Sequence, residues 1–281
     1  MRPDTLGVIG LGAIGGSVAW RAAQAGVRRV IGYSPVPAEG AAAAKAGAVT
    51  EVATNVRGAI RQADLVVIAT PPAAALGQLK AIAAELTREG ILCTDVSSVK
   101  APIVGLADAL GLAEHFAGSH PLAGTHRSGF GAARADLLEQ AIVYVTPLKQ
   151  GEAAAREVGD FWSGVCQAAP VTLDAHAHDR LVAWTSHLPQ ATASALAAAL
   201  ARSGPAGVTY GKGARDSTRL AASSVQMWSD VLLLNREAAL QALEGLEDSL
   251  GTLRQALAAG DAAALGRWLE AGARWRKDLG E

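Results

Sequence analysis

The 281-residue sequence lacks the features that mark a membrane protein, a nucleic-acid-binding protein or a disulfide-stabilised secreted protein. It contains no run of about 18 uncharged apolar residues, which excludes a membrane-spanning helix. The net charge of −1 gives no basic excess of the kind that proteins binding nucleic acid use. Its two cysteines, Cys93 and Cys166, are too few for a disulfide framework in so long a chain, and we expect both to be buried free thiols.

Aromatic residues are also scarce, at 4%, whereas hydrophobic residues make up 50% and glycines number 31. So apolar a chain can bury a sizeable core of small side chains, which excludes a disordered protein. No signal peptide precedes the first apolar stretch, so we expect a reducing cytoplasm. At roughly 150 residues per domain, the length predicts two domains.

Short apolar runs alternate with helical stretches up to about residue 147. Such alternation predicts a parallel sheet that is covered by helices on both faces. The expected strands are 6–9, 30–33, 63–69, 91–94, 116–119 and 141–145, and the expected helices are 14–25, 37–46, 73–88 and 100–110.

After Pro147 the pattern becomes helical, and we expect no strand beyond residue 151. The expected helices are 151–168, 174–202, with a kink at Pro189, 217–259 and 261–278. Leucines recur at helical spacing from Leu240 to Leu257 and form one apolar face. This face exceeds what one small helical domain needs, so we expect a homodimer through it. The predicted domains are 1–150 and an all-helical unit, 151–281.

Glycines in the pattern G-x-G-x-x-G follow the first predicted strand directly and open the first helix. The first makes a tight turn, the second admits a pyrophosphate to the backbone, and the third allows close packing of helix and strand. In this context the pattern predicts a doubly wound, Rossmann-type α/β domain that binds NAD or NADP. We assign the cofactor site to Gly10, Gly12, Ile14, Gly15, Ser34, Thr70 and Pro71.

The position that decides between NAD and NADP carries Ser34. NAD-binding domains usually place a carboxylate there, at the end of the second strand, to hold the ribose hydroxyls. The first acidic residue here is Glu39, which we expect to lie too far along the chain. No arginine follows Ser34 to bind a 2′-phosphate either, so the sequence leaves the choice between the two cofactors open.

Two polar segments follow predicted strands, at the edge of the sheet where ligands bind. The first runs from Asp95 to Lys100, where Ser97 or Ser98 either faces the ligand or caps the next helix. The second contains His120, which can accept a hydroxyl proton beside a nicotinamide.

The helical half adds a basic cluster, Lys212, Arg215 and Arg219, which a helix would gather on one face. In a chain of net charge −1, this cluster is the best candidate for binding an anionic substrate, although it is also explained by a solvated helix face. Asp216 can pair with one of its members. The spacing of the histidines fits no metal site, and we expect none.

Taken together, these motifs resemble the prephenate/arogenate dehydrogenase family of tyrosine biosynthesis. Five segments carry the resemblance, in order and across nearly the whole chain: Gly10–Gly15, Asp95 with Ser98–Lys100, Gly118–Pro121 with Gly124–Thr125, His178–Asp179 with Ser186–Pro189, and Arg215–Arg219 with Met227–Trp228 and Asn235–Arg236.

The resemblance implies an oxidative decarboxylation of prephenate to 4-hydroxyphenylpyruvate, with hydride transfer to the nicotinamide. It implies that His120 polarises or deprotonates the ring hydroxyl with Ser98 nearby, and that Arg219 binds a substrate carboxylate. The residues implied to complete the substrate site are Thr125, Ser186, His187, Gln190 and Trp228. The family's helical domains form a dimer.

Three positions depart from the pattern of many family members. His126 stands in place of a glutamate, Gln190 in place of a histidine, and Ser34 in place of an aspartate. The first two lie near the substrate's side chain, so arogenate stays open as the alternative substrate. Two different functions also stay open. One is a dehydrogenase of another hydroxy acid, for which we find no matching catalytic lysine motif, and the second is a sensor that binds nucleotide without turnover.

Overall fold

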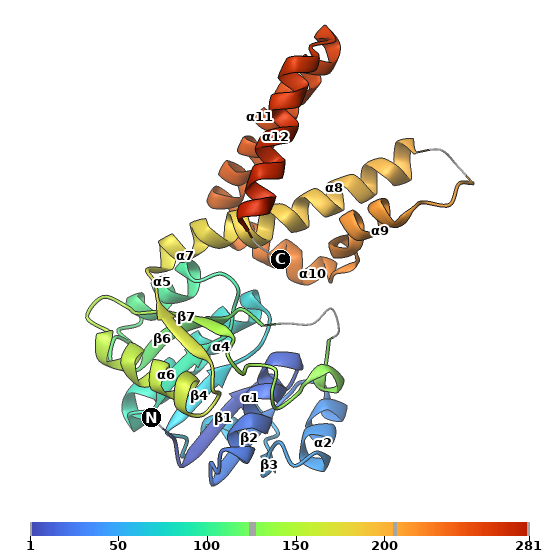
Figure 1. The fold of residues 1–281 in the computed structure, drawn as a ribbon. Coiled ribbons are helices and arrows are strands. Elements are labelled where there is room, and N and C mark those ends of the chain that lie inside the picture. Colours follow the sequence, from blue (N-terminus) through green and yellow to red (C-terminus); the bar gives the residue numbers. More distant parts are fainter. Residues whose placement is uncertain (1, 124–127, 205–206, 280–281) are drawn as a thin grey trace.

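The computed structural model describes residues 2–123, 128–204 and 207–279. An α/β layer carries the N-terminus, and helices of the C-terminal part project from it as arms (Figure 1). Within the described ranges, no helix is both long and apolar enough to cross a membrane.

One eight-stranded sheet organises the α/β layer, in the order β3-β2-β1-β4-β5-β6-β7-β8. All neighbours are parallel except β6 and β7, so the prediction of a parallel sheet is confirmed for most of the strands, and the antiparallel pair is a departure from it. The strands are β1 (Thr5–Ile9), β2 (Arg29–Tyr33), β3 (Glu51–Val52), β4 (Leu65–Ile68), β5 (Leu92–Asp95), β6 (Phe116–Pro121), β7 (Ile142–Thr146) and β8 (Ala169–Thr172). The chain reverses its winding between β1 and β4, and the carboxyl ends there form a crevice for ligands.

Both faces of the sheet are buried, which explains the uninterrupted apolar runs of its strands. In β4, Leu65 and Val67 pack into one hydrophobic cluster, while Val66 and Ile68 pack into the other. The first face is covered by α1 (Ala13–Gln24), α2 (Pro37–Lys45) and α6 (Glu152–Gly164), and the second by α3 (Val56–Ile60), α4 (Pro72–Glu89) and α5 (Ala101–Ala109). Cys93 and Cys166 are both buried free thiols, as expected.

The sheet continues beyond residue 151, contrary to expectation. Helix α6 packs on the sheet, and β8 then pairs with β7. This strand escaped prediction because it has only four residues, all exposed, and includes Pro170. We therefore propose a domain boundary after Thr172 rather than near residue 150.

The C-terminal part is helical, but it is broken more often than the pattern indicates. Its elements are α7 (Ala175–Val182), η2 (Ala183–His187), α8 (Leu188–Ser203), α9 (Lys212–Thr218), η3 (Arg219–Ala222), α10 (Val225–Leu234), α11 (Arg236–Ala259) and α12 (Ala262–Asp278). The expected single helix over 217–259 is wrong, because the Ser224 side chain caps a new helix and Asn235 separates α10 from α11. A kink is expected at Pro189. In the structure, the π-helical turn η2 interrupts the helix just before this residue.

Candidate active site

The carboxyl end of β1 leads into a turn that only glycines can form. Gly10 has φ +101°, and a Cβ there would lie 2.4 Å from the carbonyl oxygen of Ala69. A Cβ on Gly15 would lie 1.9 Å from the carbonyl oxygen of Gly10. These two contacts explain the first and third glycines of the motif, because each closes the turn against neighbouring backbone.

The middle glycine has a different role. Gly12 is the N-cap of α1, no side chain caps its N–H groups, and the first turn contains no acidic residue. A Cβ on Gly12 would meet no atom within 4 Å, so the space in front of the helix is open. This cradle fits the pyrophosphate of a dinucleotide, which binds to free helix N–H groups.

The other residues assigned to the cofactor lie along the same edge. Ile14 is in the first turn of α1, and Thr70 and Pro71 follow β4, where the Thr70 methyl group packs near Gly10. Ser34 follows β2, whose last residue, Tyr33, accepts a hydrogen bond from the Gly10 N–H at 2.7 Å. The structure therefore brings the expected cofactor residues together at the switch in strand order.

A buried ion pair supports the next part of the edge. The Lys100 ammonium and the Asp95 carboxylate are paired and completely buried, and Lys100 also donates to the Ser119 carbonyl at 2.7 Å. Asp95 accepts the Ser119 N–H at 3.1 Å, and Trp162 donates to the Ser119 hydroxyl at 2.9 Å. Together these bonds hold the C-terminal ends of β5 and β6 in place. They thereby fix the position of the residue that follows Ser119.

That residue, His120, heads a chain of three hydrogen-bonded side chains. Its Nδ1 lies 2.8 Å from His178 Nε2, and His178 Nδ1 lies 2.8 Å from Asp179 Oδ1. A carboxylate only accepts, so His178 donates from Nδ1 and accepts at Nε2. His120 must then donate from Nδ1, so its Nε2 carries no proton and can act as an acceptor. This is the tautomer that a general base requires.

The environment also keeps His120 neutral. Burial lowers the pKa of His120 well below its ordinary value, and nearby His178, Lys100 and His187 lower that pKa further. A neutral imidazole can accept a proton, so His120 stays available as a base at pH values at which an ordinary histidine is already protonated.

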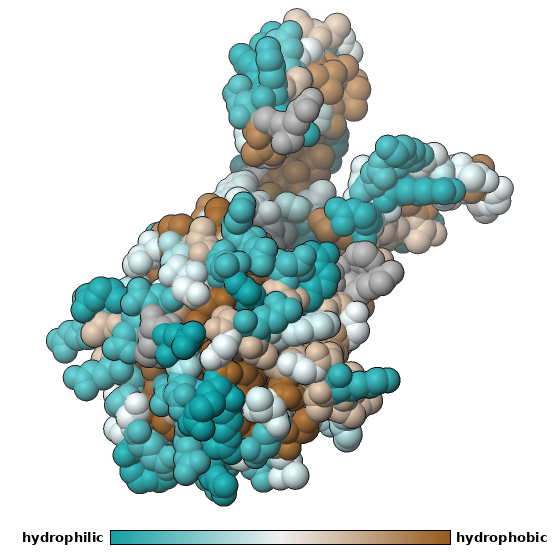
Figure 2. Space-filling view, turned by 60° about the horizontal axis from the view of Figure 1, so that its bottom comes forward, coloured by the Kyte–Doolittle hydropathy of each residue, from teal (hydrophilic) through white to brown (hydrophobic). Residues whose placement is uncertain are grey.

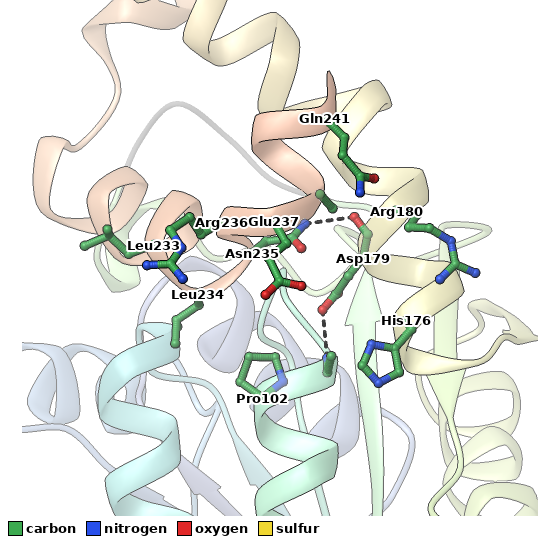
Figure 3. A pocket seen from close by; sticks show the side chains of 12 residues that line it. Pro102, His176, Asp179, Arg180, Leu233, Leu234, Asn235, Arg236, Glu237 and Gln241 are labelled. Carbon is green, nitrogen blue, oxygen red and sulfur yellow. Dashed lines mark hydrogen bonds between the residues drawn. The ribbon is translucent and has the colours of Figure 1, made fainter. Parts of the chain in front are cut away.

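Asp179 is the hub of this arrangement. Its carboxylate accepts the backbone N–H groups of Lys100 at 2.7 Å and Ala101 at 2.8 Å, where α5 begins. Asp179 rather than Ser97 or Ser98 therefore caps this helix, so of the two alternatives for those serines the helix cap is wrong. The Asp179 carbonyl oxygen accepts from Asn235 at 2.8 Å, and Figure 3 shows Asp179 between Asn235 and the start of α5.

Asn235 extends the network to a third imidazole. Its amide nitrogen lies 3.2 Å from His187 Nδ1, so Nδ1 accepts and the proton of His187 resides on Nε2. Burial lowers the pKa of His187 to about 4, although Asp179 partly opposes this. His187 is thus a neutral N–H donor, and its ring packs edge-on to Trp228 at 5.9 Å between centroids.

A cavity of about 370 Å³ opens beside His120. It is lined by His120, Tyr144, Thr185, Ser186 and neighbouring apolar residues, so the expected base and one expected substrate residue, Ser186, meet there. Gln190 is buried, and its amide donates to the Leu220 carbonyl at 2.9 Å, which ties α8 to the turn that begins with Arg219. Arg219 itself is exposed and does not line this cavity.

For the remaining residues singled out in the sequence, some predictions can be compared with the structure and others cannot. Ser98 lies in the turn between β5 and α5, on the same edge as His120, but no hydrogen bond joins the two within the described residues. Asp216 pairs with Lys212 at 3.6 Å, which confirms the expected pairing. Thr125 and His126 lie outside the described residues.

Three members of the network, His178, Asp179 and Asn235, stand in the sequence motifs without a predicted role. Two adjacent ionisable residues in one helix were the signal that could have identified them. His178 and Asp179 stand next to each other in α7, and both are buried. Buried ionisable neighbours of this kind need partners, and their partners here are the catalytic candidate and a helix terminus.

Comparison with known proteins gives matches in both parts of the chain. Residues 19–169 match the family described as the nucleotide-binding domain of prephenate dehydrogenase, and residues 174–271 match its dimerization domain. The prephenate dehydrogenase of Lactococcus lactis subsp. cremoris is 33% identical over 279 residues, which cover 97% of this chain and 76% of that protein.

Two solved structures extend the similarity. The prephenate dehydrogenase of A. aeolicus in complex with hydroxyphenyl propionate and NAD+ superimposes with a TM-score of 0.88 at 29% identity, covering 98% of each chain. The arogenate dehydrogenase of Synechocystis superimposes with a TM-score of 0.81 at 25% identity, covering 98% of this chain and 99% of that one.

Proposed function

This chain belongs to the prephenate dehydrogenase family and is a nicotinamide-dependent oxidoreductase, and we propose that it converts prephenate to 4-hydroxyphenylpyruvate with His120 as the general base. The observation that carries the assignment of His120 is the hydrogen-bonded chain from His120 through His178 to Asp179, which leaves His120 Nε2 free to accept a proton.

The residues act on the ring hydroxyl of the substrate. His120 Nε2 accepts the hydroxyl proton as the carbon–hydrogen bond at the same ring carbon breaks. The bound nicotinamide supplies the acceptor for that hydride. The electrons of the bond to the ring carboxylate then enter the ring, which becomes aromatic as carbon dioxide leaves. The Asp179 carboxylate stabilises the positive charge that develops on the two imidazoles.

The helical part supplies the remaining contacts. We propose that the Arg219 guanidinium binds a substrate carboxylate, and that Ser186 and His187 donate hydrogen bonds in the pocket. Ser98 would hold the ring hydroxyl together with His120, and Trp228, which packs against His187, would cover the far end of the substrate. These roles place anionic groups of the substrate against cationic or donor groups of the protein.

The experiment that tests this function follows the absorbance of the reduced nicotinamide with prephenate or arogenate, each with NAD+ or NADP+. We expect turnover with prephenate. Absence of turnover with both substrates and both cofactors would overturn the proposal and favour a protein that binds nucleotide without reaction.

Arogenate is the second candidate substrate, because it differs from prephenate only in carrying an amino group in place of the side-chain keto group. The Gln190 side-chain oxygen is buried without a hydrogen-bond partner in the described part of the chain. An ammonium group is a donor that suits such an acceptor. Faster turnover of arogenate than of prephenate in the same assay would favour this alternative.

We predict that His178→Phe lowers kcat by about 10- to 100-fold, since His120 loses the acceptor that fixes its tautomer. The substitution keeps a ring against Tyr144. Because His178 also helps to lower the pKa of His120, its loss should raise that pKa and move the acid limb of kcat/KM to higher pH. The pH profile of both variant and wild type measures this.

The exposed His176 on the same helix provides the control, as His176→Phe should leave the profile unchanged. An acid limb that stays in place in His178→Phe, with kcat within about threefold of wild type, would show that His178 only fills space.

We also propose that the helical part forms a homodimer. Leu240 and Leu250 on α11 are each 50% exposed, and Figure 2 shows hydrophobic surface on the projecting arm of α11 and α12. So much apolar surface on a single chain is typical of an interface. Sedimentation equilibrium should give about twice the chain mass of 28.6 kDa, and a monomer would contradict the proposal.

A further inference from the structure

The end of β2 carries a carboxylate in the structure, although the sequence places a serine there. The Ser34 hydroxyl donates to Glu39 Oε2 at 2.6 Å. Glu39 lies in the first turn of α2, the helix that follows β2 in the chain (Figure 1). The expectation that Glu39 lies too far along the chain is therefore wrong, because the helix turn returns it to Ser34.

From this geometry we propose that Glu39 selects NAD over NADP by taking the place of the usual carboxylate at the end of β2. Ser34 directly follows Tyr33, whose carbonyl oxygen accepts from Gly10 in the pyrophosphate turn. In dinucleotide-binding domains, the carboxylate at this place accepts hydrogen bonds from the adenosine ribose hydroxyls.

The Ser34 hydroxyl strengthens this discrimination. The single proton of this hydroxyl is donated to Glu39 and is therefore not available to a phosphate. The hydroxyl oxygen in turn accepts from the Val36 N–H at 3.2 Å. Between Ser34 and Lys45 the sequence contains no basic residue to pair with a 2′-phosphate. A phosphate placed beside Glu39 would thus meet the negative charge of that carboxylate, which disfavours a second anion there.

The surroundings leave the Glu39 carboxylate reachable. Ser34 and Glu39 are both partly exposed. The second carboxylate oxygen, Oε1, faces Gly129, where a Cβ would lie only 3.2 Å away. Gly129 has φ +77°, which favours glycine, and residue 129 therefore places no side chain against the carboxylate.

The competing explanation is that Glu39 only braces the start of α2. Glu39→Gln separates the two, because the amide oxygen can still accept from Ser34 while the charge is lost. Glu89→Gln serves as the matched control, since it removes one exposed carboxylate at the C-terminal end of α4, far from the pyrophosphate turn.

Isothermal titration calorimetry with NAD+ and with NADP+, in the absence of substrate, tests the proposal. We expect wild type to bind NAD+ more tightly, and Glu39→Gln to raise the affinity for NADP+ relative to NAD+ by about tenfold or more, as removal of a charge a few ångströms from a phosphate predicts. The thermal midpoints of wild type and variant verify that both are folded, and Glu89→Gln should keep the wild-type ratio.

A wild-type preference for NADP+, or a ratio in Glu39→Gln within about threefold of wild type, would overturn the proposal. The inference rests on the use of a nicotinamide cofactor and not on the identity of the substrate. Failure of this titration would therefore leave the proposed reaction on prephenate untouched, because cofactor binding is measured without turnover.

Discussion

His120→Asn is expected to lower kcat by about 10²- to 10⁴-fold, the contribution usual for a general base. Asparagine can still donate to His178 Nε2, but it offers no basic nitrogen to the ring hydroxyl. Wild-type His120 is kept neutral because burial lowers its pKa. Its catalytic activity should therefore persist at pH values below the ordinary pKa of histidine, and kcat/KM should fall only when this imidazole becomes protonated.

Steady-state kinetics with prephenate measure the loss, and calorimetry with NAD+ provides the control. Binding of the cofactor should stay within about threefold of wild type, because His120 lies at the end of β6 and the pyrophosphate turn lies at the end of β1. A kcat reduced by less than about threefold would exclude His120 as the base.

Arg219→Ala is expected to raise the KM for prephenate by about 10- to 100-fold, the range for loss of a hydrogen bond to a charged group. Arg219 begins η3, and this turn is tied to α8 by the bond from Gln190 to the Leu220 carbonyl. A substrate that carries two carboxylates loses one anchor when the guanidinium is removed, while the chemistry at His120 is unchanged.

Arg215→Ala is the matched control for Arg219, since it removes an exposed arginine one turn earlier, on α9. We expect a much smaller rise in KM from it. Equal effects of the two substitutions would indicate a general electrostatic attraction of the substrate. An unchanged KM in Arg219→Ala would exclude Arg219 as the carboxylate anchor.

The sheet domain could largely be predicted because its signals are local. The apolar run that becomes β4 is buried on both faces, and at the first and third glycines after β1 no larger residue fits the turn. The strands that escaped prediction, β3 and β8, have two and four exposed residues, so neither shows the apolar pattern that marks a buried strand.

The candidate site was predictable only in part, because much of it depends on contacts between distant segments. His120 could be found from its place at the end of a strand. The role of Asp179 could not, since it caps a helix that begins 78 residues earlier in the sequence. Glu39 was misjudged for a different reason, because a short turn brings it back to Ser34 over five residues.

The most direct test of the central claim measures the products of one reaction with purified protein, prephenate and NAD+. We predict equal amounts of reduced nicotinamide, carbon dioxide and 4-hydroxyphenylpyruvate in wild type, and amounts of all three lowered by at least about 100-fold with His120→Asn over the same time. Reduction of the cofactor without release of carbon dioxide, or equal turnover by the two proteins, would contradict it.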